Sequence, residues 1–261
     1  MSSYLDVAVE AALEGGSILV EEFARPVDIS YKGEVDIVTQ ADKRSEKAVV
    51  SRVRASFPDH TIIAEEGGGV ATDSPFRWYV DPLDGTTNFA HGYPCFAVSI
   101  GLEEAGELVA GVIYQPITKE LFTAVEGGGA YLNDQRIHVS AIKKLATSLL
   151  ATGFPSHKRA QTPNMHYYYD FTLRSHGVRR DGSAALDLAA VACGRFDGFW
   201  EFGLHSWDTA AGALLIREAG GAATRFDGKP YRPGDPEILA TNGHVHEEMR
   251  EIAVGIASRV S

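Results

Sequence analysis

Apolar residues recur at helical spacing in the first part of the chain. Leu5, Ala12 and Leu19 lie on one face of an amphipathic helix that we predict from about residue 4 to 24, stopped near Pro26. Residues 27–38 alternate weakly, which predicts extended chain with a loop at Lys32-Gly33. The pair Thr39 and Asp42 has the spacing of a capping box and begins a second helix that continues to about Phe57.

Short runs of β-branched and aromatic residues predict strands through the middle of the chain. The expected strands cover 61–64, 76–80, 96–102, 108–115 and 120–125, and a further hairpin follows between the glycines at 127–129 and the turn at 133–134. In the second half, expected strands (148–152, 199–201, 222–226 and 237–241) mix with expected helices (163–176, 182–193, 209–219 and 244–258). This order predicts an α+β fold.

A change of composition near 140–147 divides the expected single domain, residues 1–261, into lobes of about 1–143 and 144–261. The 44% apolar and 23% charged composition is that of a globular protein, and no apolar run reaches the roughly 18 residues of a membrane span. Residues 1–22 contain no Lys or Arg, so we expect no secretion signal and a cytoplasmic protein. Cys95 and Cys193 are then expected as buried free thiols rather than a disulfide.

The net charge of −11 argues against a nucleic-acid or anionic-membrane surface. It also argues against an anionic substrate, unless bound divalent cations invert the sign of the charge at the site.

The stretch from Asp81 to Phe89 carries the most specific chemistry. It follows the strand 76–80, which we expect to stop at Pro82 because proline cannot donate to a sheet ladder. Asp81 and Asp84 can then converge on one cation, while Gly85 lets the backbone approach a ligand and the N–H groups after it hold an anion. The alternative for such a sequence is an ordinary turn.

Four carboxylates occupy expected ends of elements: Glu65, Asp81, Asp84 and Asp208. Singly, each is compatible with a turn or cap, and Asp208 with a helix N-cap. Together they would repel each other unless cations lay between them, and all-oxygen ligands favour Mg²⁺, with Mn²⁺ as a substitute. His244 and His246 are expected at the exposed start of the last helix, not in a zinc site.

Three motifs resemble those of the inositol monophosphatase family. They are the Glu65-Glu66 pair, the nonapeptide Asp81–Phe89 (DPLDGTTNF) and the hexapeptide Trp207–Gly212 (WDTAAG). The resemblance implies the family's layered α-β-α-β-α sandwich. It also implies a lithium-sensitive, Mg²⁺-dependent hydrolysis of myo-inositol monophosphate, and a homodimer.

The resemblance also implies roles for individual residues. Glu65, Asp81 and the Leu83 carbonyl would hold one metal ion, and Asp81, Asp84 and Asp208 a second, in a site of two or three ions. Thr86 and Asp42, with Glu65, would be catalytic and orient a water. The substrate would contact Asp84, Gly85, Thr86, Arg179, Gly182, Ser183, Ala184, Glu201 and Asp208. Whether Arg179 or Arg180 approaches the substrate stays open, and Glu201 has the alternative of a surface charge at a strand end.

Several alternatives stay open. The phosphorylated substrate could instead be fructose 1,6-bisphosphate, histidinol phosphate, a glycerol phosphate or NADP. A regulatory protein that binds the transcription machinery is a second class, with a basic face at Arg179, Arg180 and Lys158-Arg159. A structural Ca²⁺ protein is disfavoured because the chain has no EF-hand loop. The tyrosines at 167–169 could line a dimer interface or cover the core.

Overall fold

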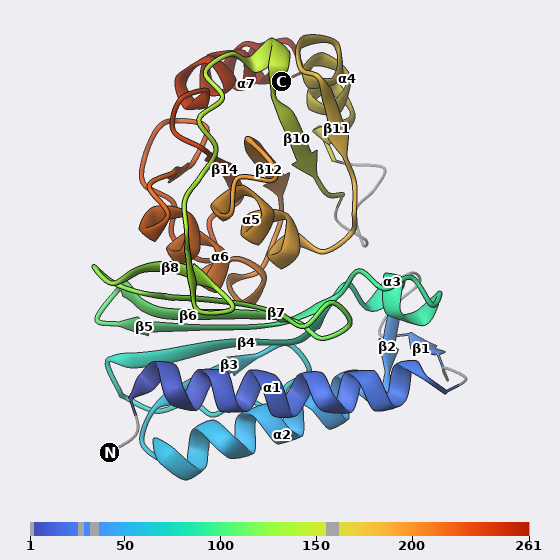
Figure 1. Cartoon of the computed structure of the whole chain (residues 1–261), viewed down its shortest axis with the longest axis vertical. Coiled ribbons are helices and arrows are strands. Elements are labelled where there is room, and N and C mark those ends of the chain that lie inside the picture. The colour runs from blue at the N-terminus through green and yellow to red at the C-terminus, as the bar shows by residue number, and fades with distance from the viewer. Residues whose placement is uncertain (1–2, 26–28, 32–36, 155–161, 261) are drawn as a thin grey trace.

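The protein folds as five stacked layers of helix and sheet. The structure is a computed structural model and describes residues 3–25, 29–31, 37–154 and 162–260. Figure 1 shows two helices at one side, a large sheet, a second pair of helices, a smaller sheet, and a last pair of helices on the far side. The expected α-β-α-β-α sandwich is therefore confirmed.

The first half of the chain builds the large sheet and its outer helices. The helices are α1 (Tyr4–Phe23), α2 (Gln40–Ser56) and the short α3 (Thr86–Ala90). The large sheet has the order β3-β4-β5-β6-β7-β8-β9, with only β3 and β4 parallel. Its strands are β3 (Thr61–Ala64), β4 (Phe76–Asp84), β5 (Ala97–Glu104), β6 (Glu107–Gln115), β7 (Glu120–Val125), β8 (Gly129–Leu132) and β9 (Gln135–Ile137). A separate antiparallel pair joins β1 (Ile29–Tyr31) to β2 (Ile37–Thr39).

The second half builds the smaller sheet, in the order β11-β10-β12-β14-β13. Its strands are β10 (Leu149–Thr152), β11 (Gly177–Arg179), β12 (Gly198–Phe202), β13 (Ala222–Thr224) and β14 (Glu237–Thr241). Its helices are a 3₁₀ turn (Leu145–Thr147), α4 (Asn164–Arg174), α5 (Ala184–Ala192), α6 (Ser206–Glu218) and α7 (His246–Val260). The three-residue β11 was not predicted, because the polar sequence around it carries no strand signal.

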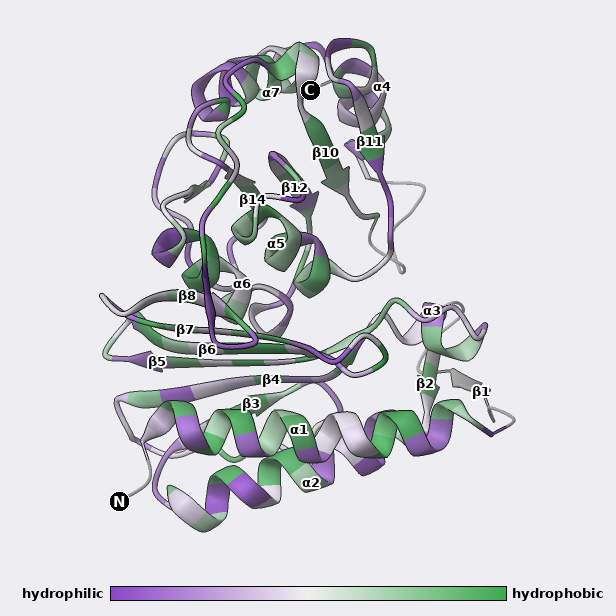
Figure 2. Cartoon of the chain, in the orientation of Figure 1, coloured by the Kyte–Doolittle hydropathy of each residue, from purple (hydrophilic) through white to green (hydrophobic). Residues whose placement is uncertain are grey.

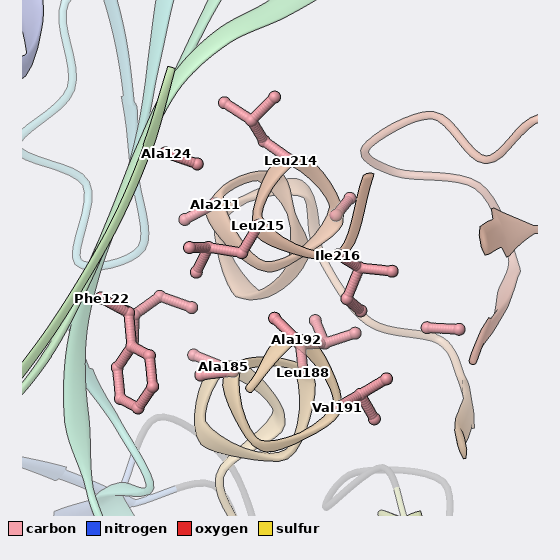
Figure 3. Close-up of a cluster of buried hydrophobic side chains, with 14 of the residues drawn as sticks. Phe122, Ala124, Ala185, Leu188, Val191, Ala192, Ala211, Leu214, Leu215 and Ile216 are labelled. Carbon is pink, nitrogen blue, oxygen red and sulfur yellow. The ribbon is translucent and has the colours of Figure 1, made fainter. Parts of the chain in front are cut away.

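Helices α5 and α6 form the central layer, and their residues are mainly Ala and Leu. Figure 3 shows Ala185, Leu188 and Ala192 of α5 directed toward α6, with Phe122 and Ala124 of the large sheet beside them. Figure 2 shows that these two helices are hydrophobic over most of their surface, whereas α1 alternates between hydrophobic and hydrophilic residues. This difference follows from position, because α5 and α6 are covered on both sides and α1 faces water on one side.

The outer helices pack as the sequence pattern predicted. The Thr39–Asp42 capping box is present at the start of α2, and a second one joins Ser3 to Asp6 at the start of α1. The buried face of α1 includes Ala8, Ala12 and Leu19, which pack with α2 against the outer face of the large sheet. Lys32 and the pair at 158–159 lie outside the described residues.

Several expectations at element ends were wrong. Strand β4 does not stop at Pro82 but continues to Asp84, because a bulge accommodates the proline. His246 begins the last helix, α7, but it is not exposed. It is partly buried, and its ring nitrogens are 2.9 Å from the hydroxyls of Thr224 and Thr241. Cys95 and Cys193 are free thiols as expected, but each is only partly buried.

The tyrosines of α4 differ in burial. Tyr167 is 2% exposed and packs against Phe202 and Phe226, so it belongs to the core. Tyr169 is 66% exposed and lies in line with Met165 and Leu173, one turn away on either side.

The close contact between α6 and the large sheet gives a test of packing. A Cβ at Gly101 would lie 2.6 Å from the Ala210 Cβ and 3.0 Å from the Ala211 nitrogen. We expect Gly101→Ala to lower the free energy of unfolding by about 1–3 kcal/mol, because the extra carbon overpacks this contact. Chemical denaturation measures the loss. The control is Gly255→Ala, because a Cβ at Gly255 meets nothing within 4 Å, and this variant should not lower stability. Gly106→Ala is unsuitable as a control because the φ of Gly106 is positive.

Candidate active site

A β-bulge in β4 places Asp81 and Asp84 on one face of the sheet. In a regular strand, residues three apart face opposite sides. Here Asp81 pairs with Ser99 and Asp84 pairs with Ala97, so three steps along β4 match two steps along β5. The extra residue brings both carboxylates to the same side. The Leu83 N–H donates to Asp81 Oδ1 at 3.0 Å, which fixes the bulge.

Asp84 connects the large sheet to the start of α5. Its Oδ2 accepts hydrogen bonds from the Ser183 hydroxyl at 2.6 Å and from the Ala185 N–H at 2.7 Å. Ser183 is also the N-cap of α5, where backbone N–H groups lack intrahelical partners. A carboxylate is favoured at such a helix end, so this contact fixes both the helix and Asp84.

Asp208 reaches the same site from α6. It is not the N-cap, as the alternative had it, but the third residue of the helix, and its carboxylate accepts from the His205 N–H at 2.7 Å. The Ser99 hydroxyl donates to the Trp207 carbonyl at 3.2 Å, which ties the start of α6 to the strand residue opposite Asp81. The indole of Trp207 stacks on the His205 ring, with centroids 4.6 Å apart, and packs against the central core.

Glu65 follows β3 directly, and the loop after it is tied down. The Glu46 carboxylate of α2 accepts hydrogen bonds from the N–H groups of Glu66 at 2.6 Å and Gly68 at 2.7 Å. Backbone bonds between Ile62 and Val70 close the loop at its base. Although this loop contains three glycines, at 67–69, the buried Glu46 carboxylate anchors it.

The four carboxylates act on one another electrostatically. Burial is the main cause that raises the pKa of Asp81 well above its usual value, and the charges of Glu65, Asp84 and Asp208 raise it further. The pKa of Asp208 is raised by burial and then by Asp84 and Glu65. Burial also raises the pKa of Asp84 to about 6. Such mutual repulsion in a buried place is relieved by a cation.

The donor set fits a hard divalent cation, because it consists of carboxylate and carbonyl oxygens. Within the described part of the chain, no three Asp, Glu, His or Cys side chains are already arranged as a closed metal site. The carboxylates are thus neighbours that share one electrostatic environment, rather than a preformed cage.

Thr86 and Asp42 come together although they are far apart in sequence. The Thr86 hydroxyl lies 3.1 Å from Asp42 Oδ1 and 3.0 Å from the Leu83 carbonyl. The other oxygen of Asp42 accepts from the N–H and hydroxyl of Thr39. Burial raises the pKa of Asp42 to about 6. Asp42, which completes the capping box of α2, is therefore also the hydrogen-bond partner of Thr86.

Gly85 makes the turn between β4 and α3. Its φ of 98° is in the left-handed region, and a Cβ there would lie 2.8 Å from the Cys95 carbonyl. Asn88, in α3, donates to the carbonyls of Cys95 and Asp181, both at 2.8 Å. This side chain holds the nonapeptide against the segment that precedes Gly182 and Ser183.

The substrate-side residues expected in the second half gather around Ser183. Glu201 is not a surface charge: it is 6% exposed, and burial, Asp208 and Asp84 raise its pKa well above the usual value. The charge of Arg180 lowers that pKa, whereas the Arg179 guanidinium donates to the neighbouring Val178 carbonyl at 3.5 Å. The electrostatics therefore favour Arg180 over Arg179 as the arginine near the carboxylates.

The model of the inositol monophosphatase family matches residues 1–258. The chain belongs to the inositol monophosphatase family. Members of this family are phosphatases and are generally metal-dependent, so the chain is a phosphoric monoester hydrolase.

Individual members cover nearly the whole chain. An inositol-1-monophosphatase of Rhizobium meliloti is 45% identical over 96% of both chains. A protein of Salmonella typhimurium named Nus factor SuhB is 44% identical over 95% of both chains. The crystal structure of the extragenic suppressor protein suhB from Bartonella henselae has a TM-score of 0.90 and 43% identity, covering 96% of this chain and 98% of that one.

Sequence reasoning missed two acidic residues beside the site. Glu46 follows Asp42 by four residues, so both lie on the same face of α2, and this spacing was the available signal. Asp187 is the only charged residue in the apolar run of α5, and it is 2% exposed.

Among the described helices, none is long and apolar enough to cross a membrane.

The raised pKa of Asp84 predicts a pH dependence of stability. Because the folded value of about 6 exceeds the usual 3.8, the folded state binds the proton more tightly, and Asp84 destabilises the metal-free protein as the pH rises from about 4 to 6. We expect the stability of Asp84→Asn relative to the parent to rise over this window and then level off. Urea denaturation with EDTA, from pH 4.5 to 7.5, measures the difference.

The control variant is Asp73→Asn, which changes an exposed carboxylate in the same way. A stability difference for Asp84→Asn that is the same at every pH would contradict the assignment of a raised pKa to this carboxylate.

Proposed function

We propose that the protein hydrolyses myo-inositol monophosphate to inositol and phosphate with Mg²⁺, in a site of two or three ions, with Mn²⁺ as a substitute. The observation that carries the proposal is the bulge in β4, which turns Asp81 and Asp84 to one face beside the start of α6. Its support is the family, whose members include proteins named inositol-1-monophosphatase.

The ligands in this proposal are Glu65, Asp81 and the Leu83 carbonyl for one ion, and Asp81, Asp84 and Asp208 for a second. A divalent cation, when bound, supplies a water that is activated near neutral pH and neutralises the charge of the phosphate. The four carboxylates would hold these cations, whose positive charge would keep the phosphate from meeting four unbalanced negative groups.

The neighbouring residues would orient the reactants. The Thr86 hydroxyl can donate to Asp42, so its oxygen can accept a hydrogen bond from a water and orient it. The N–H groups at the start of α3, after Gly85, have no intrahelical acceptors and can hold phosphate oxygens. The wall that contacts the polyol would consist of Gly182, Ser183, Ala184 and Glu201. Arg179 or, as the electrostatics favour, Arg180 would lie at its edge.

Phosphate release from a panel of phosphomonoesters tests this function. We expect Mg²⁺-dependent release, strongest with inositol 1-phosphate and inhibited by lithium. In Asp84→Asn it should fall on the order of 100-fold or more, because a metal's charge stabilisation amounts to several kcal/mol. The panel includes fructose 1,6-bisphosphate, histidinol phosphate, glycerol phosphate and NADP. A preference for one of these would change the substrate, and silence from a folded protein would end the phosphatase proposal. Asp73→Asn, away from the site, should match the parent.

A second candidate function is binding to the transcription machinery. The observation that favours it is the group of relatives named Nus factor SuhB, four of which are 43–44% identical to this chain. The surface to examine includes Arg179 and Arg180, which are exposed.

Retention of purified RNA polymerase on the immobilised full chain tests this candidate. We expect retention by the parent and loss of it in Arg180→Glu, because charge reversal removes the proposed basic contact. The matched control is Arg54→Glu on α2, remote from this face. Equal retention by both variants, or none by the parent, would count against it.

We also propose a homodimer, as the family resemblance implies. The exposed row on α4 formed by Met165, Tyr169 and Leu173, each at least 60% exposed, is the apolar surface that supports it.

A further inference from the structure

A buried carboxylate on α5 has no role in the contacts described so far. Asp187 is 2% exposed, and within the described residues its carboxylate forms no hydrogen bond or ion pair. Buried polar groups are nearly always hydrogen-bonded, because burying one without a partner costs free energy. Among the described residues the Asp187 oxygens are not fully buried unpaired atoms, so the missing donor can come from water or from a ligand.

The position of Asp187 on α5 directs it toward the site. It follows Ser183 by four residues, so the two share a face of the helix, and Ser183 is the residue that donates to Asp84. The residues of α5 that meet α6 are others, among them Ala185 and Leu188, as Figure 3 shows. Asp187 is thus on the face of α5 that borders the carboxylates, not on the apolar contact.

The charges that act on Asp187 locate its carboxylate further. The negative groups are Asp181, Glu201 and Asp84, and the positive group is Arg180. Asp84 belongs to the proposed metal site and Glu201 to the proposed polyol wall. Asp187 therefore lies near both proposed ends of the site, the metal ligands and the polyol wall.

Glu201 packs closely against Gly153. A Cβ on Gly153 would lie 2.2 Å from Glu201 Oε2 and 2.3 Å from Oε1, so the carboxylate lies directly against the backbone of residue 153. Glu201 and Asp187 are thus neighbouring acceptors, and the charge of Arg180 acts on both. Hydroxyl groups are donors that match such acceptors, and a ring polyol presents several at once.

We propose that Asp187 is a substrate contact that accepts a hydrogen bond from a ring hydroxyl of the phosphorylated polyol, and that it determines specificity together with Glu201. The inference rests on the proposed function and adds to it a residue and a reason for selecting polyol esters. A phosphomonoester without hydroxyl groups gains nothing from this acceptor, because it has no donor to offer.

Steady-state kinetics of Asp187→Asn with Mg²⁺ test the proposal on two substrates, inositol 1-phosphate and phenyl phosphate. Asn has the shape of Asp but lacks the charge, so the fold should be retained. We expect KM for inositol 1-phosphate to rise about tenfold, the effect of weakening one hydrogen bond to a charged group, with a smaller change in kcat. KM for phenyl phosphate should change less than about twofold.

Asp181→Asn is the matched control. It removes a negative charge from the same neighbourhood, but its side chain is partly exposed. We expect it to leave the ratio of the two KM values unchanged. The proposal would be overturned if Asp187→Asn changed both substrates equally, or if Asp181→Asn reproduced its selective effect.

The melting temperature of Asp187→Asn separates recognition from packing. Removing an unpaired buried charge should keep or raise it. A marked fall, together with equal losses on both esters, would assign Asp187 to the structure of α5 and overturn the proposal. If the parent releases no phosphate from either ester, the proposed function fails first and this inference falls with it.

Discussion

The site depends on keeping several negative charges close together, with Asp81 buried and Glu65, Asp84 and Asp208 half-buried. Glu65, Asp81, Asp84 and Asp208 come from two strand ends and a helix, and each raises the pKa of a neighbour or has its own raised. Without a cation, these neighbouring negative charges raise the free energy of the folded chain. A bound cation makes the same arrangement favourable. The local structure compensates part of this cost. Asp84 receives two hydrogen bonds at the start of α5, Asp81 receives one from Leu83, and Asp208 receives one from His205.

The fold serves this arrangement by close packing of small residues. Gly101 of β5 lies against Ala210 and Ala211 of α6, so the helix approaches the sheet closely and Asp208 reaches the end of β4. The bulge then supplies what a regular strand cannot, two carboxylates three residues apart on one face. Both features are local departures from ideal geometry, and both are at the site.

Much of this could be predicted from the sequence. Helices α1 and α2, the capping box at Thr39, most strands and the free thiols followed from periodicity, turn residues and composition. The motifs Asp81–Phe89 and Trp207–Gly212 identified the family, which the comparisons confirm.

The bulge at Pro82 was not predictable, because proline normally ends a strand and only the pairing of β4 with β5 shows that the ladder continues. Asp187 was missed because a single acidic residue in an apolar helix gives no pattern. Its importance comes from burial and from its neighbours Glu201 and Arg180. The ligand roles of the individual carboxylates remain predictions.

The hydrogen bond from Ser183 to Asp84 connects two parts of the chain that are about a hundred positions apart, since the residues differ by 99 in sequence. On one side of it, the large sheet, α2 and α3 carry Asp81, Asp84, Asp42 and Thr86, which would handle the phosphate together with Asp208 of α6. On the other, α5 and β12 carry the groups that would recognise the alcohol. Substitutions on α5 and β12 can therefore alter the choice of ester while the phosphate end keeps its geometry. A scaffold divided in this way can be adapted to new phosphorylated alcohols by changes in one half of the molecule.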